Sequence, residues 1–443
     1  MSNAVGNVRR ETVLAVAFVA LALAGVAFLV SGGSSSPKED VERLPSAPAA
    51  VTGSVTYRDK VLSDGGYNTF AGAWLMPDGA VATAFANVTG AAAPRCRRPG
   101  EPPGCDNRRF RGAEHRFAIR TSHDDGRTWT RPLPDELESS APPHAYSGQP
   151  VIALRGREGA KAGTLLRRIN GEDLDLYRRP GSVLGTAFLQ RLAPGAKAWT
   201  GAQVLLDPSR FTYNLSRIKR LRDGTLVALG AFWEVPAGQR LKTPDTEVPS
   251  WLLMASEDEG ATWHSAISAP ADIQQTAPAN EWDVAELPDG DLLAVMRTRE
   301  GPRTVRKQVV LRKTGDEITT TTGERSDGGW QMGTPRVTPP GFAQIAAPQH
   351  PELLNIEYGP AAGGILHIAD EAIHYTADGG RTWSRVSFPS DWTPHYYPNS
   401  VQAPGGNIYV FSHAGGDEDY TMQVDKPVYV DLVRLAVDRD SAP

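Results

Sequence analysis

The sequence predicts an all-β fold, a six-bladed β-propeller, and three observations support this prediction. One short motif occurs three times, a second motif of apolar hairpins alternates with it, and the composition suits many short strands. The 443 residues include 44 Gly and 35 Pro, more than a helical protein would use. Gly and Pro at this density are typical of strands joined by tight turns.

The first repeat reads Ser/Thr-x-Asp-x-Gly-x-Thr-Trp and covers residues 122–129, 256–263 and 376–383. A strand-like alternating stretch precedes each copy. Asp and Ser side chains can hydrogen-bond the backbone of a turn, Gly provides a positive φ, and Trp anchors a hairpin in its sheet. Two weaker copies, PGAKAWTG and RSDGGWQ, end near Trp199 and at Trp330. Each copy therefore predicts a hairpin turn.

The second repeat is an apolar hairpin with Asp-Gly or Gly-Gly at its tip, and its copies begin at Leu75, Arg220, Glu286 and Gln402. The strand after each tip is almost entirely apolar, so we expect it to be buried inside a sheet. Both repeats together predict blades near residues 66–135, 144–206, 211–268, 280–337, 350–388 and 394–438. Five or seven blades, or a β-sandwich, are the alternatives, and a two-part repeat favours radial repetition.

The first 50 residues predict a targeting segment ahead of the propeller. Residues 1–12 form a short N-terminus with Arg9 and Arg10, residues 13–30 form an apolar helix, residues 31–50 form a flexible linker, and the propeller covers residues 51–443. An apolar run of this length just spans a bilayer, and the preceding arginines keep the N-terminus cytoplasmic. We expect a transmembrane signal anchor, with a cleaved signal peptide as the alternative. Either places the propeller outside the cytoplasm, tethered to the cell membrane or secreted.

Net charge and cysteine content limit the partners. The formal net charge of -5 argues against nucleic acid, because phosphate binding needs a basic face. Cys96 and Cys105 flank a Pro- and Gly-rich loop and predict a disulfide in an oxidising compartment, with two free thiols as the alternative. Two cysteines without clustered histidines do not provide a structural zinc site.

The two repeats together resemble those of the sialidase (neuraminidase) superfamily of BNR/Asp-box propellers, over residues 60–440. The resemblance implies a glycoside hydrolase of the exo-α-sialidase type that needs no cofactor. In that family three arginines hold the carboxylate of the sugar, a Tyr activated by a Glu attacks the anomeric carbon, and an Asp serves as acid and base. A neutral phenol suits this role because the carboxylate of the substrate would repel a carboxylate nucleophile.

The resemblance assigns roles to particular residues. The stretch NEWDVAELPDGDLLAVMR matches the family segment that carries the Glu and one arginine, here Glu281 and Arg297. They open and close one hairpin, so both can lie at the same end of a blade. The nucleophile corresponds to Tyr397 or Tyr396, of which only one can face the axis, and Tyr397 is preferred. The acid corresponds to Asp106 in the long loop of the first blade. An ordinary structural role is the alternative at each position.

Two arginines of the family pattern are absent. Phe70 stands in place of the first, and the segment before the last full repeat contains none. Arg217 has a suitable local sequence and could compensate from the third blade. The Gly-rich acidic stretch SHAGGDEDY contains His413 and Asp417, which could bind sugar hydroxyls, and its carboxylates could also hold a calcium ion. An exposed acidic turn is the alternative.

These observations predict an exported sialidase-like glycoside hydrolase that acts on a terminal, acidic sugar of a glycan or glycoconjugate. The missing arginines weaken the prediction for sialic acid, because a bidentate guanidinium–carboxylate contact is strong and geometrically specific. The alternative is a non-catalytic propeller that binds cell-surface glycan or protein, since a fold alone does not fix function. Contact with the membrane is expected through the N-terminal helix only.

Overall fold

The structure is a computed structural model, and it describes thirteen parts of the chain. These are residues 50–62, 67–89, 114–130, 151–156, 161–170, 187–234, 249–276, 281–300, 303–337, 350–369, 372–389, 392–413 and 427–438. The chain divides into Met1–Pro45 and Ser46–Pro443. The predicted N-terminal helix lies outside the described residues, and so does the predicted disulfide. Among the described residues, no helix is long and apolar enough to cross a membrane.

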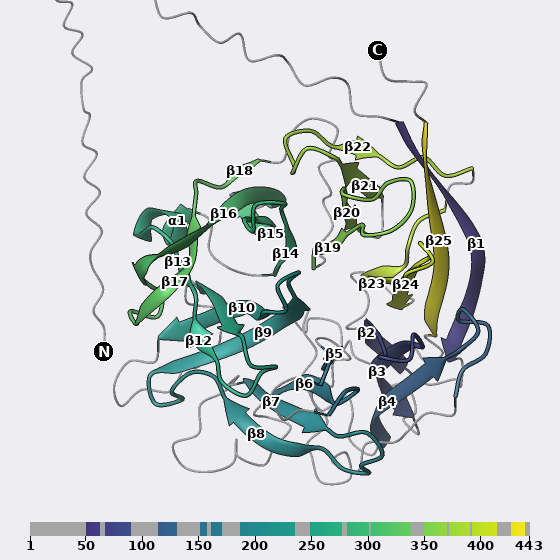
Figure 1. The fold of residues 1–443 in the computed structure, drawn as a ribbon, viewed down its shortest axis with the longest axis horizontal. Helices are drawn as coiled ribbons and strands as arrows, with labels where there is room; N and C mark the ends of the chain where they lie inside the picture. Colours follow the sequence, from purple (N-terminus) through teal and green to yellow (C-terminus); the bar gives the residue numbers. More distant parts are fainter. Residues whose placement is uncertain are drawn as a thin grey trace, which may run out of the picture. The chain divides into compact units, whose positions relative to one another are not determined.

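Six β-sheets surround a common axis in the described part of the chain (Figure 1), which confirms the predicted number of blades. Each predicted blade range contains the inner strands of one sheet. The first three sheets are formed by β2 (Tyr67–Leu75), β3 (Val81–Thr89) and β4 (Glu114–Ser122); by β5 (Val151–Ala153), β6 (Leu165–Asn170), β7 (Ala187–Leu192) and β8 (Thr200–Val204); and by β9 (Phe211–Arg220), β10 (Leu226–Glu234), β11 (Ser250–Ser256) and β12 (His264–Ser265).

The last three sheets complete the ring, and the fourth also recruits two short strands. They are formed by β14 (Trp282–Glu286), β15 (Leu292–Glu300), β16 (Arg303–Thr319), β17 (Arg325–Met332), β13 (Ile267–Ser268) and β18 (Arg336–Val337); by β19 (Glu352–Asn355), β20 (Ile365–Ile368), β21 (Ile373–Thr376) and β22 (Ser384–Arg385); and by β23 (Tyr396–Gln402), β24 (Ile408–His413), β25 (Val428–Asp438) and β1 (Ala50–Leu62). The short helix α1 (Ala271–Thr276) precedes the fourth sheet.

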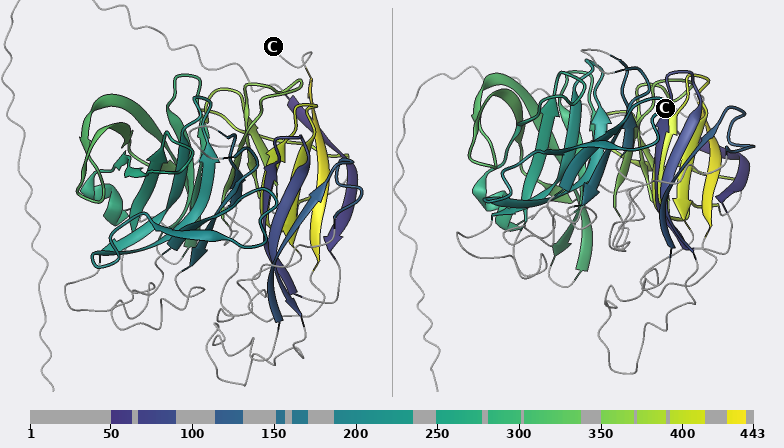
Figure 2. Two further views of the ribbon diagram at one scale, coloured as in Figure 1. Left: turned by 60° about the horizontal axis from the view of Figure 1, so that its bottom comes forward. Right: turned by 90° about the horizontal axis from the view of Figure 1, so that it is seen from below.

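The two ends of the propeller chain are joined in one sheet. β1 is the outer strand of the sixth sheet and pairs antiparallel with β25, from Ala50 opposite Asp438 to Leu62 opposite Val428. Figure 2 shows β1 beside the yellow strands of this sheet. The sequence analysis assigned these first residues to no blade. Their pairing closes the ring, because it binds the first strand of the chain to the last.

The hydrophobic core consists of clusters between neighbouring blades. Six clusters of buried side chains occur among the described residues, and each contains side chains from two adjacent sheets. Between the third and fourth sheets, for example, the rings of Trp251 and Trp282 meet edge to face with centroids 4.9 Å apart. Such aromatic pairs stabilise a core beyond the area that they bury. Each junction between neighbouring blades therefore has its own hydrophobic cluster.

The three full copies of the first repeat form identical turns. In the second copy the Asp258 carboxylate accepts from the Thr262 hydroxyl at 2.6 Å and from the Ser256 hydroxyl at 2.8 Å. The Ser256 oxygen accepts from the Gly260 N–H at 2.8 Å. The turns at 122–128 and 376–382 repeat these contacts. The predicted turn chemistry is thus present three times.

The weaker copy RSDGGWQ is a different structure, and its prediction as a turn was wrong. These residues lie inside β17, and the turn before them falls at residues 320–324. The pairing of β16 with β17 is interrupted by an irregularity between Thr314 and Glu317. Gly328 and Gly329, with φ of 89° and 139°, adopt the backbone that this irregularity requires. Glycines that suggested a turn therefore serve a bulged strand.

Candidate functional site

The starts of the inner strands meet at one end of the axis, which we call the Glu281 end. β14, β19 and β23 are the inner strands of the fourth, fifth and sixth blades, and each packs against the next. Glu281 immediately precedes β14, and its carbonyl accepts from the Arg297 N–H at 2.8 Å. The opposite end, where the inner strands turn at the Asp-Gly and Gly-Gly tips, is called the hairpin-tip end below.

The structure brings Tyr397, Glu281 and Arg297 together at the Glu281 end. The Tyr397 hydroxyl donates to Glu281 Oε1 at 2.9 Å. Arg297 Nη1 donates to Glu281 Oε2 at 2.5 Å. The side chains of Arg297 and Glu281 are 21% and 24% exposed, so the cluster is half-buried and reaches solvent. The carboxylate thus links a phenol to a guanidinium across two blades that are distant in sequence.

The backbone at Tyr397 is strained, and the strain positions its side chain. Tyr397 has φ of +50°, a left-handed value that is unusual for an aromatic residue. The residue precedes Pro398, which further restricts its backbone. Pairing of β23 with β24 shifts between Tyr396 and Asn399, so a bulge occurs at this position. Strain of this kind costs about 1–3 kcal/mol and concentrates at functional sites.

Electrostatics in the cluster keep the phenol protonated at rest. Burial, the Glu281 carboxylate and the neighbouring Tyr396 all raise the pKa of Tyr397, while Arg297 opposes them. Burial lowers the pKa of Arg297, but the Glu281 carboxylate outweighs it and the pKa is raised. A neutral phenol that donates to a carboxylate can pass its proton to that carboxylate when it attacks an electrophile. The arrangement can therefore generate an oxygen nucleophile.

Tyr396 and His413 are buried and pack against Tyr397. Tyr396 is 6% exposed and His413 is fully buried. The His413 ring stacks on Tyr397 with centroids 6.1 Å apart, and it meets Tyr396 edge to face at 5.6 Å. The two residues are opposite each other in the pairing of β23 with β24. In this position His413 supports the Tyr397 ring, and its burial argues against the predicted contact with sugar hydroxyls.

Arg217 lies on the axis, within a buried network of charges. Its Nη2 atom is 3.0 Å from Glu352 Oε2, and its Nε atom is 4.0 Å from Asp283 Oδ2. The same Asp283 oxygen accepts from Lys219 Nζ at 2.7 Å. Glu352 Oε1 accepts from the N–H and the hydroxyl of Ser400, at 2.9 and 2.7 Å. Burial raises the pKa of Glu352, and Arg217 opposes that shift.

This network connects the strands that carry the candidate site. Asp283 is two residues after Glu281 on β14, and Ser400 is three residues after Tyr397 on β23. Arg217, from β9, contacts the carboxylates that hold both strands. The sequence analysis expected Arg217 to hold an anionic substrate group, but its guanidinium faces two buried carboxylates. Nothing local in the sequence identified Glu352 and Asp283 as partners of Arg217, or Lys219 as a partner of Asp283.

The remaining predicted residues lie outside the described parts of the chain. These are the candidate acid Asp106, the candidate ligand Asp417, and both cysteines, Cys96 and Cys105. Their roles remain predictions. Within the described ranges, no group of three or more His, Cys, Asp or Glu side chains could hold a metal ion.

Comparisons with known proteins support the fold. No protein-family model matches the chain, and no curated protein matches it in sequence. A protein of unknown function from Dyadobacter fermentans is 17% identical, with a TM-score of 0.53 over 89% of this chain and 100% of its own. An α-L-arabinanase of Penicillium chrysogenum complexed with arabinobiose is 14% identical, with a TM-score of 0.52 over 88% of this chain and 99% of its own.

An intramolecular trans-sialidase of Ruminococcus gnavus in complex with oseltamivir carboxylate gives 11% identity and a TM-score of 0.51, over 86% of this chain and 97% of its own. At these identities the likeness concerns the fold alone. The chain is a six-bladed β-propeller whose fold resembles those of glycoside hydrolases.

Proposed function

We propose that this protein is a glycoside hydrolase of the sialidase type, in which Tyr397 is the nucleophile and Glu281 is its base. One observation carries the proposal, the 2.9 Å hydrogen bond that the strained Tyr397 donates to Glu281. Base and nucleophile within hydrogen-bond reach, with the base itself held by a third group, are the signature of an activated nucleophile. Arg297 is that third group.

The reaction proceeds in two displacements at the anomeric carbon. In the first, the Tyr397 oxygen bonds to that carbon, the phenolic proton passes to Glu281, and the bond to the leaving oxygen breaks as an acid protonates it. In the second, water attacks the anomeric carbon and gives a proton to the conjugate base of that acid, and Tyr397 leaves with the proton that Glu281 held. Asp106 stays the candidate acid, on the family resemblance alone. The sugar keeps its configuration because each displacement inverts it once.

The sugar is a terminal one, and two substrate classes compete. Arg297 at the Glu281 end favours an acidic sugar, as the resemblance to sialidases implies. The Arg297 charge is already balanced by Glu281, and Arg217 faces Glu352, which favours a neutral sugar. The two enzymes of similar fold differ in the same way, since one is an arabinanase and the other an intramolecular trans-sialidase. We propose an acidic sugar first and an arabinofuranoside as the alternative.

Export of the propeller is part of the proposal and rests on the apolar residues 13–30. A chain in which this segment is a signal anchor would hold the propeller outside the cytoplasm, where glycans are substrates. A non-catalytic propeller that binds glycan or protein is the other outcome of the test below.

The test is release of a fluorogenic aglycone from an aryl α-sialoside and an aryl α-L-arabinofuranoside by the full chain. Glu281→Gln and Tyr397→Phe should lower kcat about 10²–10⁴-fold, because each removes one partner of the proton transfer. Glu257→Gln and Tyr358→Phe are matched controls on exposed residues, and both should retain activity. Full activity of the Glu281→Gln variant would exclude Glu281 as the base. No release from either substrate by the folded protein would favour the binding propeller.

A further inference from the structure

A separate cavity opens at the hairpin-tip end of the axis. Its volume is about 510 Å³, within the range of small-molecule sites. β2, β9 and β23 line it, together with residues 151–155 of the second blade, whereas Tyr397, Glu281 and Arg297 are not among its lining residues. A smaller cavity of about 280 Å³ shares its wall at Arg155, Lys219, Arg220, Glu352, Ser400 and Val401.

The charged lining of the larger cavity is predominantly basic. Arg155, Arg217, Lys219 and Arg220 line it, and Glu352 is the carboxylate in the same wall. Glu352 is already occupied, since Ser400 and Arg217 contact its two oxygens. Anions that enter the cavity therefore meet more positive than negative charge.

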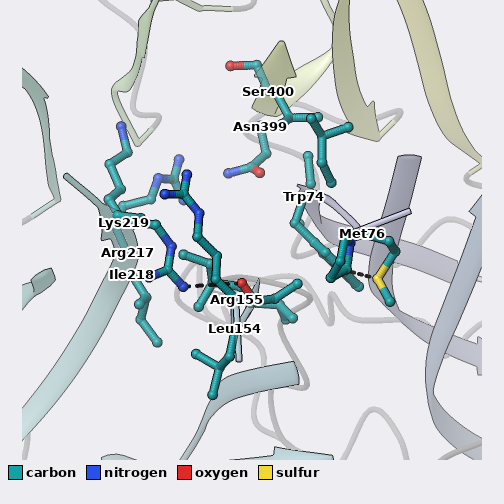
Figure 3. Close-up of a pocket in the computed structure, with 18 of the residues that line it drawn as sticks. Trp74, Met76, Leu154, Arg155, Arg217, Ile218, Lys219, Asn399 and Ser400 are labelled. Atoms are coloured by element: carbon teal, nitrogen blue, oxygen red, sulfur yellow. Dashed lines mark hydrogen bonds between the residues drawn. The ribbon is translucent and has the colours of Figure 1, made fainter. Parts of the chain in front are cut away.

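Three of these cations are compensated, and the fourth is not. Arg217 and Lys219 contact Asp283, and Arg220 forms an ion pair with Glu259. The backbone N–H of Arg155 also donates to Glu259, at 2.9 Å. The Arg155 guanidinium makes no ion pair with another residue of the described ranges. In Figure 3 the Arg155 side chain lies beside Arg217 and Lys219 on one side of the cavity.

The opposite side of the cavity is apolar and amide-bearing. Trp74 and Met76 lie there in Figure 3, and Met76 is half-buried. Asn399 lies between Trp74 and the cations, and Ser400 lies above it in the view of Figure 3. A bare inorganic ion would leave the apolar wall and most of the volume unfilled. A ring-sized body with one anionic group would use both sides.

We propose that this cavity is a second ligand site, for a sugar acid or a chemically similar ring carboxylate, with Arg155 as the residue that holds the carboxylate. A planar guanidinium suits a carboxylate because it can donate two parallel hydrogen bonds. The reacting groups of the proposed hydrolysis, Tyr397 and Glu281, lie at the Glu281 end and do not line this cavity.

The experiment is calorimetric titration of the full chain with D-glucuronate, beside neutral methyl β-D-glucoside as the matched probe. We expect glucuronate to bind and the glucoside to bind at least tenfold more weakly. Arg155→Gln should weaken glucuronate binding at least about tenfold, the effect of losing a charged hydrogen bond. Arg312→Gln is the control, because Arg312 is exposed on β16 and does not line the cavity.

Other variants separate this site from the Glu281 end. Glu281→Gln should leave glucuronate binding unchanged, and Arg155→Gln should leave glycoside hydrolysis unchanged. Loss of binding in Glu281→Gln would assign the ligand to the other end and overturn the proposal. Equal affinity of Arg155→Gln and the parent protein would overturn it as well, and so would equally tight binding of inorganic phosphate, since that indicates a bare anion site.

Discussion

The buried pair of Arg217 and Glu352 should cost stability when either partner is removed alone. The side chains are each 3% exposed, so a lone charge would remain in the interior. Removing one partner of a buried ion pair typically costs about 3–5 kcal/mol. In Arg217→Met, Glu352 loses its cation but keeps the two donors of Ser400, and Asp283 keeps Lys219. We therefore expect about 3 kcal/mol, at the lower end of that range.

The double variant distinguishes a coupled pair from two unrelated residues. Glu352→Gln should cost a similar amount, since it leaves Arg217 with Asp283 at 4.0 Å. Arg217→Met with Glu352→Gln removes both charges, so we expect a total loss below the sum, with a coupling free energy of about 2 kcal/mol. Urea unfolding at constant pH measures all four proteins. Additive losses within about 0.5 kcal/mol would refute the reasoning.

The same variants decide what Arg217 does at the site. A residue that holds the substrate carboxylate would raise KM for an acidic glycoside when replaced, with little loss of stability. A residue that positions β14 and β23 would lower stability and kcat, because both strands carry the reacting groups, and KM would change less. The structure favours the second result. A rise in KM alone would restore the role that the sequence analysis gave to Arg217.

Two further predictions concern stability. A Cβ added at Gly230 would lie 1.9 Å from the Asn214 carbonyl oxygen, so Gly230→Ala should cost about 1–3 kcal/mol in thermal unfolding, whereas Gly405→Ala, with no atom within 4 Å, should cost much less; equal losses would contradict this. Burial, with a smaller effect of Arg385, lowers the pKa of His374 to about 4. The unfolded chain, with a pKa of about 6.5, then binds protons more tightly. The contribution of His374 to the free energy of unfolding is therefore fully present above pH 6.5. It is lost, by up to about 3 kcal/mol, as the pH falls toward 4. His374→Phe should flatten the free energy of unfolding over this pH window, and an unchanged pH profile would contradict the assignment.

The fold could be predicted because its signals are local and repeated. A turn that needs Ser or Thr, Asp, Gly and Trp at fixed offsets imposes a pattern on the sequence, and three of the six blades repeat that pattern in full. β1 carries neither repeat, so its pairing with β25 was invisible, because the partner lies almost 400 residues away in a chain of 443. RSDGGWQ was misassigned for the opposite reason, since turn-forming residues also suit a bulged strand.

The candidate site was predictable to the extent that one hairpin defines it. The pairing of β14 with β15 places Glu281 and Arg297 at the same end, and that pairing follows from the Asp-Gly tip between them. The choice between Tyr396 and Tyr397 depends on a bulge and a positive φ at Tyr397, which no residue type announces. Strand alternation alone could show that the two face differently, but not which one reaches Glu281.

Paired charges on the axis connect the inner strands of neighbouring blades. The inner strands have no further strand on their axial side, so polar side chains of β9, β14, β19 and β23 meet there instead. Burying such charges is favourable only when they are paired, and Arg217, Lys219, Asp283 and Glu352 pair across three blades. Arg217, Lys219 and Glu352 line the cavity at the hairpin-tip end, while Asp283, on the strand β14 that begins beside Glu281, accepts from the Leu353 N–H of β19. A ligand at the hairpin-tip end therefore contacts the residues that position the candidate site, without reaching the site itself.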